Sequence, residues 1–172
     1  MKAVIFGASG QDGRYLTKEC KKKGIEVIPF SRTLNGLSGD ISNFSIVNNI
    51  IKDHKPNYVF HLAANSTIKH DAIFDNHQTI ATGTINVLEA VKKYSPSSKV
   101  FITGSGVQFK NYGKNISEES EFEASSPYGI SRIQSVYTAR YYATLGIKTY
   151  VGYLFNQITN ISHALIISNK IF

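Results

Sequence analysis

Residues 3–16 read AVIFGASGQDGRYL, an apolar run followed by three glycines at intervals of three residues. The run 3–6 predicts a buried strand, and the glycines lie where that strand would turn into a helix. Gly7 suits a tight turn, Gly10 lets a ligand approach the backbone, and Gly13 lets the helix pack closely on the strand. The first NH groups of a helix attract anions, so this stretch predicts a loop that binds a diphosphate. A glycine turn without a ligand is the alternative.

The same order of strand and helix continues through the chain. Strands are predicted at residues 2–6, 25–30, 58–63, 99–104 and 148–154, and helices at 12–23, 44–54, 72–94 and 127–145. Because the strand runs are almost continuously apolar, both faces of the sheet should be covered. The pattern therefore predicts an α/β fold with a doubly wound parallel sheet and helices on both faces. The polar, Glu-rich segment 110–126 shows no pattern, and a loop of this length is more often functional than not.

The composition is that of one globular domain, with 42% apolar and 18% charged residues in a chain of 172. Cys20 is the single cysteine, which excludes a disulfide scaffold and favours a packing role in a reducing compartment. The apolar run before Gly7 is too short for a signal peptide or a membrane span. We therefore expect a soluble, cytoplasmic protein without a membrane partner.

The charge is strongly positive. Nineteen Lys and Arg against 12 Asp and Glu give a formal net charge of +7. The cations are scattered along the sequence and no recognition motif accompanies them, so nucleic acid is not the expected partner. A basic surface suits an anionic, nucleotide-linked substrate equally well. The five histidines lack the spacing of metal ligands, and no metal is expected.

Six short stretches, in register, resemble one known family. They are GQDGRYL at 10–16, GDI at 39–41, HLAA at 61–64, GTINVLEA at 83–90, SPY at 126–128 and LFN at 154–156. With them the chain resembles the extended short-chain dehydrogenases/reductases of the NAD-dependent epimerase/dehydratase family, and within it the branch that dehydrates GDP-mannose. The resemblance implies a Rossmann-type fold and a nucleotide-sugar substrate such as GDP-mannose. It also implies a homodimer formed by the long helices 72–94 and 127–145.

The end of the second predicted strand bears on the choice of dinucleotide. It reads Pro29-Phe30-Ser31-Arg32 and lacks the carboxylate that would bind the adenosine ribose of NAD. Arg32 suits a 2′-phosphate, so NADP is predicted as the cofactor. NAD is the alternative, and Arg32 is then an ordinary surface arginine. By the resemblance, the cofactor contacts Gly7, Ser9, Gly10, Gln11, Asp12, Gly13, Arg32, Asp40, Ile41, Leu62, Ala63, Ala64, Tyr128, Arg132, Leu154 and Asn156.

Tyr128 is the predicted catalytic base. A tyrosine can take a hydroxyl proton when nearby positive charge lowers its pKa, and Arg132 lies one helical turn after it. The family has lysine at that position, and a planar guanidinium is not interchangeable with an ammonium. Ser105, at the end of the fourth predicted strand, is expected to hold the sugar oxygen. A small residue at a strand end, without catalysis, is the alternative for Ser105.

Two departures from the family bear on the activity. Its dehydratases have a threonine at this point, followed closely by an acidic residue, whereas this chain has Gln108, so either Glu118 or Glu119 substitutes or dehydration is lost. The chain also ends where a C-terminal substrate-binding portion would begin. Residues 1–156 are therefore predicted as the NAD(P)-binding domain, and 157–172 as the start of a missing or truncated portion.

Two functions from different classes follow from these residues. The first is an NADP-linked nucleotide-sugar 4,6-dehydratase or 4-epimerase that oxidises the sugar at C4, with Tyr128, Arg132 and Ser105 as catalytic residues. The second is a catalytically silent dinucleotide-binding module that acts as a sensor or as a subunit of an assembly. The altered position 132 favours the second, and the retained glycines are compatible with both.

Overall fold

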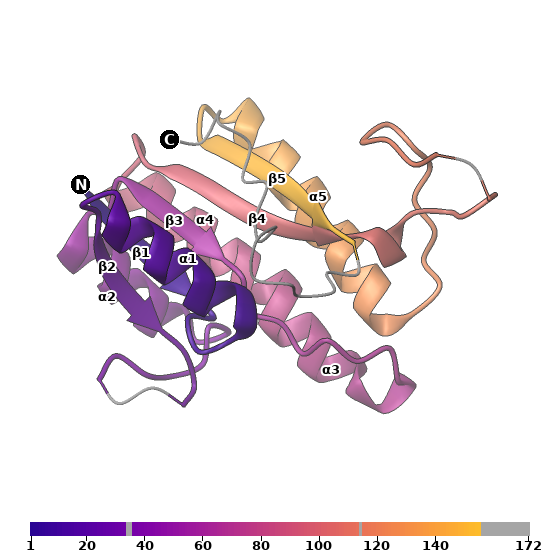
Figure 1. Ribbon diagram of the computed structural model, residues 1–172, viewed down its shortest axis with the longest axis horizontal. Helices are drawn as coiled ribbons and strands as arrows, with labels where there is room; N and C mark the ends of the chain where they lie inside the picture. The colour runs from indigo at the N-terminus through magenta and orange to yellow at the C-terminus, as the bar shows by residue number, and fades with distance from the viewer. Residues whose placement is uncertain (34–35, 114, 156–172) are drawn as a thin grey trace.

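The computed structural model describes residues 1–33, 36–113 and 115–155, and in them five parallel strands form one sheet (Figure 1). The strands are β1 (Lys2–Phe6), β2 (Glu26–Phe30), β3 (Tyr58–His61), β4 (Lys99–Ser105) and β5 (Lys148–Leu154). Their order in the sheet is β2-β1-β3-β4-β5, so the chain moves from β1 to one side and then returns to the other. Ligands bind beyond the carboxyl ends of the strands at such a reversal, here at β1 and β3.

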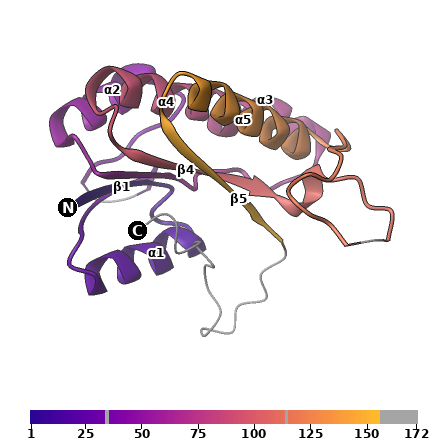
Figure 2. The same ribbon diagram turned by 90° about the horizontal axis from the view of Figure 1, so that it is seen from above.

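Helices cover both faces of the sheet, as the apolar strands predict (Figure 2). On one face lies α1 (Gln11–Lys22); on the other lie α2 (Phe44–His54), α4 (Gly83–Tyr94) and α5 (Pro127–Thr144). The prediction of a doubly wound α/β fold is confirmed. The predicted bounds of the five strands and of three of the helices differ from the observed bounds by at most two residues.

The helix predicted over residues 72–94 is not continuous. It consists of a 3₁₀ turn (η1, His70–Ala72), a short α3 (Ile73–Asn76), a π-helical segment (η2, His77–Thr82) and α4. The carbonyl oxygen of Ile80 accepts hydrogen bonds from the Thr84 hydroxyl at 2.7 Å and from Nε2 of His61 at 3.4 Å. The Gly83 nitrogen donates to the same oxygen, so the Ile80 carbonyl is shared by two side chains and a backbone NH where η2 passes into α4.

The core has one apolar layer on each face of the sheet. The larger layer joins the sheet to α2, α4 and α5 through residues such as Phe6 and Leu88. The smaller layer lies under α1 and contains Leu16, Cys20 and Phe60. Cys20 is fully buried, and burial raises the pKa of its thiol to about 11. This environment keeps the thiol protonated and fits the packing role predicted for it.

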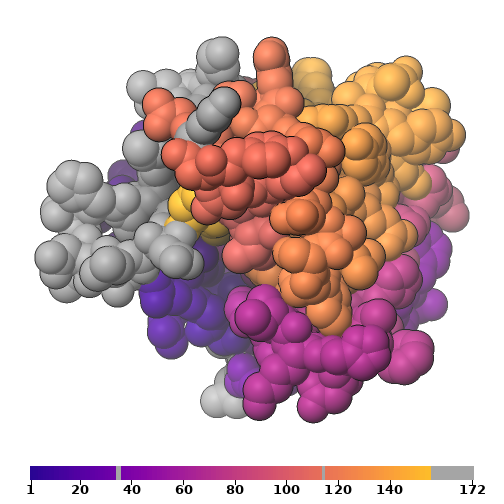
Figure 3. Space-filling view, turned by 90° about the vertical axis from the view of Figure 1, so that its right-hand side faces the viewer, coloured from indigo at the N-terminus to yellow at the C-terminus, as the bar shows by residue number. Residues whose placement is uncertain are grey.

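The predicted loop 110–126 is paired at its base rather than irregular throughout. It follows a 3₁₀ turn (η3, Gly106–Gln108), and the backbone nitrogen of Lys110 donates to the carbonyl oxygen of Glu121 at 2.8 Å. Phe109 and Phe122 face each other across this antiparallel pair, with ring centroids 5.1 Å apart. Figure 3 looks onto this end of the molecule, where the segment lies beside α5.

Two of the expectations above concern residues for which the structure gives no description. Asn156 and the predicted unit 157–172 lie outside the described residues. Among the helices that are described, none is long and apolar enough to cross a membrane.

Candidate active site

The loop between β1 and α1 contains three glycines with different surroundings. Gly7 has φ +91°, and a Cβ there would lie 2.6 Å from the backbone nitrogen of Ala63. A Cβ on Gly13 would lie 2.3 Å from the carbonyl oxygen of Gly7. Gly10 is the N-cap of α1 without a side-chain cap, and a Cβ there would lie 3.3 Å from the same oxygen. Gly7 and Gly13 therefore fix the loop, whereas Gly10 leaves the helix N-terminus open to an anion.

The end of β2 holds this loop in place. The backbone nitrogens of Gly7 and Ala8 both donate to the carbonyl oxygen of Phe30, at 2.9 and 3.1 Å. Beyond the strand, the Thr33 hydroxyl donates to the Ser9 hydroxyl at 3.4 Å. The glycine loop and the segment after β2 thus form two adjoining walls of one depression.

A pocket of about 180 Å³ occupies this depression, at the carboxyl ends of β1, β2 and β3. Its lining includes nine predicted cofactor residues: Gly7, Ser9, Gly10, Arg32, Asp40, Ile41, Leu62, Ala63 and Ala64. It also includes five residues that were not predicted: Phe30, Ser31, Thr33, Gly39 and Thr79. Ser31, Thr33 and Gly39 adjoin predicted residues in the sequence and Phe30 lies two positions before Arg32, so proximity could have found these four. Thr79 comes from η2, and no local sequence signal points to it.

The other predicted residues are not part of that lining. Of those the structure describes, they are Gln11, Asp12, Gly13, Tyr128, Arg132, Leu154 and Ser105. The first three form the first turn of α1, whose backbone NH groups would face an anion bound at Gly10. The combination of an open helix N-terminus and an adjoining pocket fits the diphosphate and one nucleoside of a dinucleotide.

Tyr128 and Arg132 lie in the first two turns of α5, beside the end of β4. Ser126 caps this helix, its hydroxyl oxygen accepting a hydrogen bond from the Gly129 nitrogen at 3.0 Å. The Arg132 guanidinium stacks on the Tyr128 ring, 5.1 Å from its centroid. The Nη1 of Arg132 donates both to the carbonyl oxygen of Thr103, at 2.6 Å, and to the Thr103 hydroxyl, at 2.7 Å. The two predicted residues are thus brought together, and Thr103 fixes the cation.

Arg132 is a buried cation. Only 4% of the residue is exposed, and its Nε has no hydrogen-bond partner. Burial lowers the pKa of Arg132, while the nearby Tyr128 and Asp12 act in the opposite direction. Burial raises the pKa of the Asp12 carboxyl, which lies in the first turn of α1. The charge of Arg132 acts against this rise. The glycine loop and the start of α5 are therefore electrostatically coupled.

Ser105 ends β4, where Gln108 holds its backbone. The Ser105 nitrogen donates to Oε1 of Gln108 at 2.8 Å, and the Ser105 hydroxyl oxygen accepts from the Val107 nitrogen at 3.4 Å. Gln108 is fully buried, with an Nε2 that lacks a partner. The structure therefore places an amide, not a carboxylate, against Ser105, while the loop residues Glu118 and Glu119 are exposed.

His61 ends β3 behind the pocket and is 1% exposed. Its Nε2 donates to the carbonyl oxygen of Ile80, and Thr103 donates its hydroxyl to the His61 carbonyl oxygen at 2.9 Å. Burial, and then the charge of Arg132, lower the pKa of His61 to about 3. The ring is therefore neutral at physiological pH. Within residues 1–33, 36–113 and 115–155, no three His, Cys, Asp or Glu side chains are placed to hold a metal ion.

The neutral His61 predicts a loss of stability in mild acid. Its pKa is about 3 in the folded chain against 6.5 unperturbed, so between these values only the unfolded chain binds the proton. The free energy of unfolding then falls as the pH falls below 6.5, by up to about 1.4 kcal/mol per unit. We expect wild type to lose about 2 kcal/mol more than His61→Gln between about pH 7 and about pH 5, measured by urea unfolding. Equal losses in the two proteins would show that His61 is not the titrating group.

Comparison with known proteins agrees with this geometry. The model of the NAD dependent epimerase/dehydratase family matches residues 3–163. GDP-mannose 4,6 dehydratase 1 of Arabidopsis thaliana is 28% identical over 185 aligned residues, which cover 90% of this chain and 51% of that protein. The UDP-glucose 4-epimerase of Thermotoga maritima, solved with UDP-glucose, has a TM-score of 0.77 and 25% identity over 88% of this chain and 54% of its own.

A third protein supports the fold alone. The Bordetella bronchiseptica enzyme WbmH, solved in complex with NAD⁺, has a TM-score of 0.79 and 23% identity over 90% of this chain and 55% of its own. The chain thus spans about half the length of the relatives it matches. Since the family model covers most of the sequence, and the glycine loop and parallel sheet are in place, the chain belongs to the NAD dependent epimerase/dehydratase family.

Proposed function

We propose that this chain is the dinucleotide-binding part of an NADP-linked enzyme that oxidises a nucleotide sugar at C4, as a 4,6-dehydratase or a 4-epimerase. The observation that carries the proposal is the Tyr128–Arg132 stack, at the same carboxyl edge of the sheet as the pocket. Relatives named for GDP-mannose and UDP-glucose support a nucleotide-sugar substrate, with GDP-mannose as the first to test. A cytoplasmic location remains part of the proposal.

Each residue of the site has a task that its chemistry supports. Tyr128 accepts the proton of the sugar 4-hydroxyl, and the fixed charge of Arg132 beside the ring stabilises the resulting tyrosinate. Ser105 donates a hydrogen bond from its hydroxyl to the same sugar oxygen. NADP, when bound, supplies the hydride acceptor.

The segment after β2 supports NADP over NAD. Ser31, Arg32 and Thr33 line the pocket, and Arg32 is exposed there. Residues 29–39 contain no Asp or Glu. A 2′-phosphate gains a charge-assisted hydrogen bond from the guanidinium, whereas the ribose hydroxyl of NAD finds no carboxylate on this segment.

NADPH is expected to bind at least about tenfold more tightly than NADH, because one hydrogen bond to a charged group contributes about 1.5–3 kcal/mol. A fluorescence titration of the chain with each nucleotide measures this ratio. In Arg32→Gln the preference should disappear while NADH binding stays, since Gly10 and the helix N-terminus are untouched. Equal affinities in the wild type would contradict the NADP proposal, and binding of neither nucleotide would contradict a dinucleotide site altogether.

Gln108 favours a 4-epimerase over a dehydratase. Its side chain is buried and engaged with the Ser105 nitrogen, so it offers no acid or base for the loss of water. Oxidation and re-reduction at one carbon need only the Tyr128 proton. A ketoreductase meets the same condition.

The burial of Arg132 favours a second candidate, a dinucleotide-binding module without turnover that serves as a sensor or an assembly subunit. Its Nη1 is bound to Thr103 instead of facing the pocket lining. In either function we propose a homodimer through α4 and α5, as the resemblance implies, because Ile85 and Tyr137 on these helices are exposed.

A further inference from the structure

Lysines that are scattered in the sequence gather at one edge of the sheet. In a parallel sheet with crossover helices, every strand begins and every helix ends at the same edge, here called the amino edge. The strands begin at the same height in the sheet. Lys2 pairs with Glu26, Tyr58 pairs with Lys99, and Lys99 also pairs with Lys148. The pocket lies at the opposite edge.

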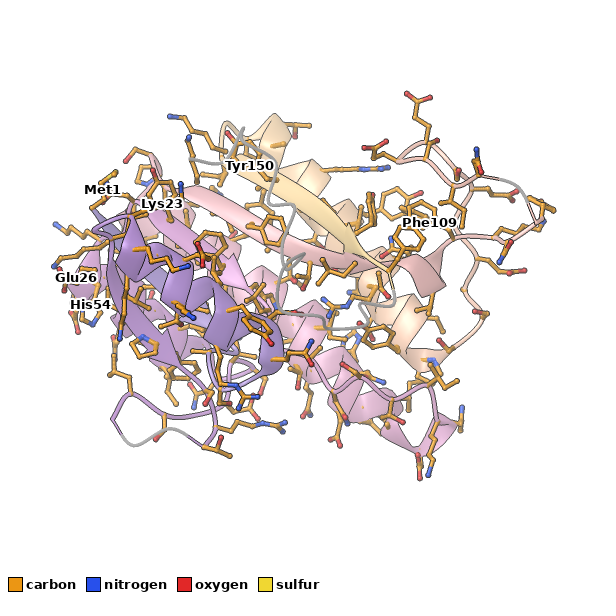
Figure 4. All side chains as sticks on the ribbon, in the orientation of Figure 1. Met1, Lys23, Glu26, His54, Phe109 and Tyr150 are labelled. Atoms are coloured by element: carbon orange, nitrogen blue, oxygen red, sulfur yellow. The ribbon has the colours of Figure 1, made fainter. Side chains whose placement is uncertain are left out.

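Figure 4 shows the two ends of the molecule. Met1, Lys23, Glu26 and His54 lie together at the amino edge, and Phe109 lies at the far end. The cations of the amino edge are Lys2, Lys18, Lys21, Lys22, Lys23, Lys52, Lys55, Lys92, Lys93, Lys99 and Lys148, and its anions are Glu19, Glu26, Asp53 and Glu89. Among the residues that the structure describes, the edge thus has 11 of the 17 cations but only four of the 12 anions, a net charge of +7. The six cations and eight anions described elsewhere have a net charge of −2, so the positive charge of the described residues lies at this edge.

Local structural roles account for only part of this charge. Each helix end has a partial charge of about −0.5, so the ends of α1, α2, α4 and α5 offset about two charges in total. Three anions pair with lysines: Glu19 with Lys22 at 2.6 Å, Glu89 with Lys92 at 3.9 Å and Glu26 with Lys2 at 4.0 Å. These anions are already included in the net charge of the edge. A surplus of about five positive charges therefore remains on one face.

The composition of the amino edge indicates which anion it fits. All its cations are lysines, while Arg14, Arg32, Arg132 and Arg140 lie elsewhere. Nucleic-acid sites that read bases or hold single strands use arginine forks or rows of stacking aromatics. Lysine is a mobile point charge, which suits a fluid array of anionic groups.

Two exposed apolar side chains lie among these lysines. Met1 is 69% exposed at the start of β1, and Leu145 is 43% exposed at the end of α5. A lipid interface accepts apolar side chains and ammonium groups together. We propose that the amino edge is a docking surface for the anionic headgroups of a lipid bilayer, with the dinucleotide pocket facing away from it. This revises the expectation of no membrane partner, which rested on the lack of a spanning segment and did not consider surface binding.

Binding of the chain to lipid vesicles tests this proposal. The chain should sediment with phosphatidylcholine vesicles that contain about 30% phosphatidylserine, and not with phosphatidylcholine alone, at about 0.1 M NaCl. Raising the salt to about 0.5 M should weaken binding about tenfold, because the Debye length shortens to a few ångströms.

Two matched triple variants locate the surface. The first, Lys21→Gln, Lys52→Gln and Lys148→Gln, removes three exposed charges from the amino edge and should weaken vesicle binding at least about tenfold. The second, Arg14→Gln, Lys69→Gln and Lys110→Gln, removes the same charge elsewhere and should change binding less than about twofold. Thermal unfolding and NADPH binding of each variant report whether the fold is kept.

Three results would overturn the proposal. Equal weakening in the two variants would show that only the overall charge matters. Sedimentation that does not depend on phosphatidylserine would show that the headgroup charge is not recognised. Tighter binding to polyuridylate or to duplex DNA than to the vesicles, again lost in the first variant, would assign the edge to nucleic acid.

Discussion

Gly13→Ala is expected to lower the free energy of unfolding by about 3 kcal/mol, and the melting temperature by roughly 6–12 °C. The added Cβ would lie 2.3 Å from the carbonyl oxygen of Gly7 and 2.6 Å from the Cα of Ala8. Both are backbone atoms, so neither can turn aside as a flexible side chain would. The steric clash can be relieved only if α1 moves away from β1. That movement also displaces the helix N-terminus that would face a diphosphate. Dinucleotide binding should be lost together with stability.

Gly10→Ala is the matched control for this prediction. Gly10 has φ −69°, which any residue adopts, and its added Cβ would lie 3.3 Å from the Gly7 oxygen. Its cost to stability should stay below about 1 kcal/mol, while NADPH binding falls at least about tenfold because the methyl group fills the approach to the helix N-terminus. Thermal melts and NADPH titrations of both variants separate the two roles. Unchanged NADPH binding in Gly10→Ala would remove the phosphate loop from the candidate site.

The parts of the site that sequence reasoning found are those with local signals. The glycines sit within seven residues of each other after an apolar run, and each spacing has a steric reason. Arg32 follows the end of β2, where the topology of a doubly wound sheet places ligands, whereas the pocket residues Asp40 and Ala63 were expected from the resemblance to the family. Tyr128 follows a capped helix start, so its position could also be expected.

What sequence reasoning missed depends on contacts between distant segments. Thr103 lies 29 residues before Arg132 in the sequence and accepts its hydrogen bond. No local sequence pattern indicates that Arg132 is buried there. Thr79 reaches the pocket from η2, a π-helical segment in contact with His61 at the end of β3, and no local pattern signals either feature. The lysines of the amino edge look scattered for the same reason, since only the parallel topology brings them to one face.

Arg132→Lys is expected to raise turnover by about tenfold or more, and Arg132→Met to abolish it. In the wild type Nη1 is held by Thr103, while Nε is buried without a partner. A lysine ammonium ends near the position of the guanidinium carbon, one bond short of the Nη1 that Thr103 holds. Its three rotatable donors are then available to the Tyr128 hydroxyl and to the cofactor ribose. Single-turnover reduction of NADP⁺ with GDP-mannose and with UDP-glucose measures the effect.

Arg132→Met separates lost chemistry from lost structure. Methionine keeps most of the volume but removes a cation whose pKa burial has already lowered, so relief of desolvation offsets the lost bonds to Thr103. The free energy of unfolding of Arg132→Met should stay within about 1 kcal/mol of wild type. If this variant is stable but has no activity, the loss is due to the missing positive charge. If wild type and Arg132→Lys both bind NADPH and neither reduces NADP⁺ with any nucleotide sugar, the enzyme proposal is wrong. The Tyr128–Arg132 stack would then be structural, and the chain a dinucleotide-binding module.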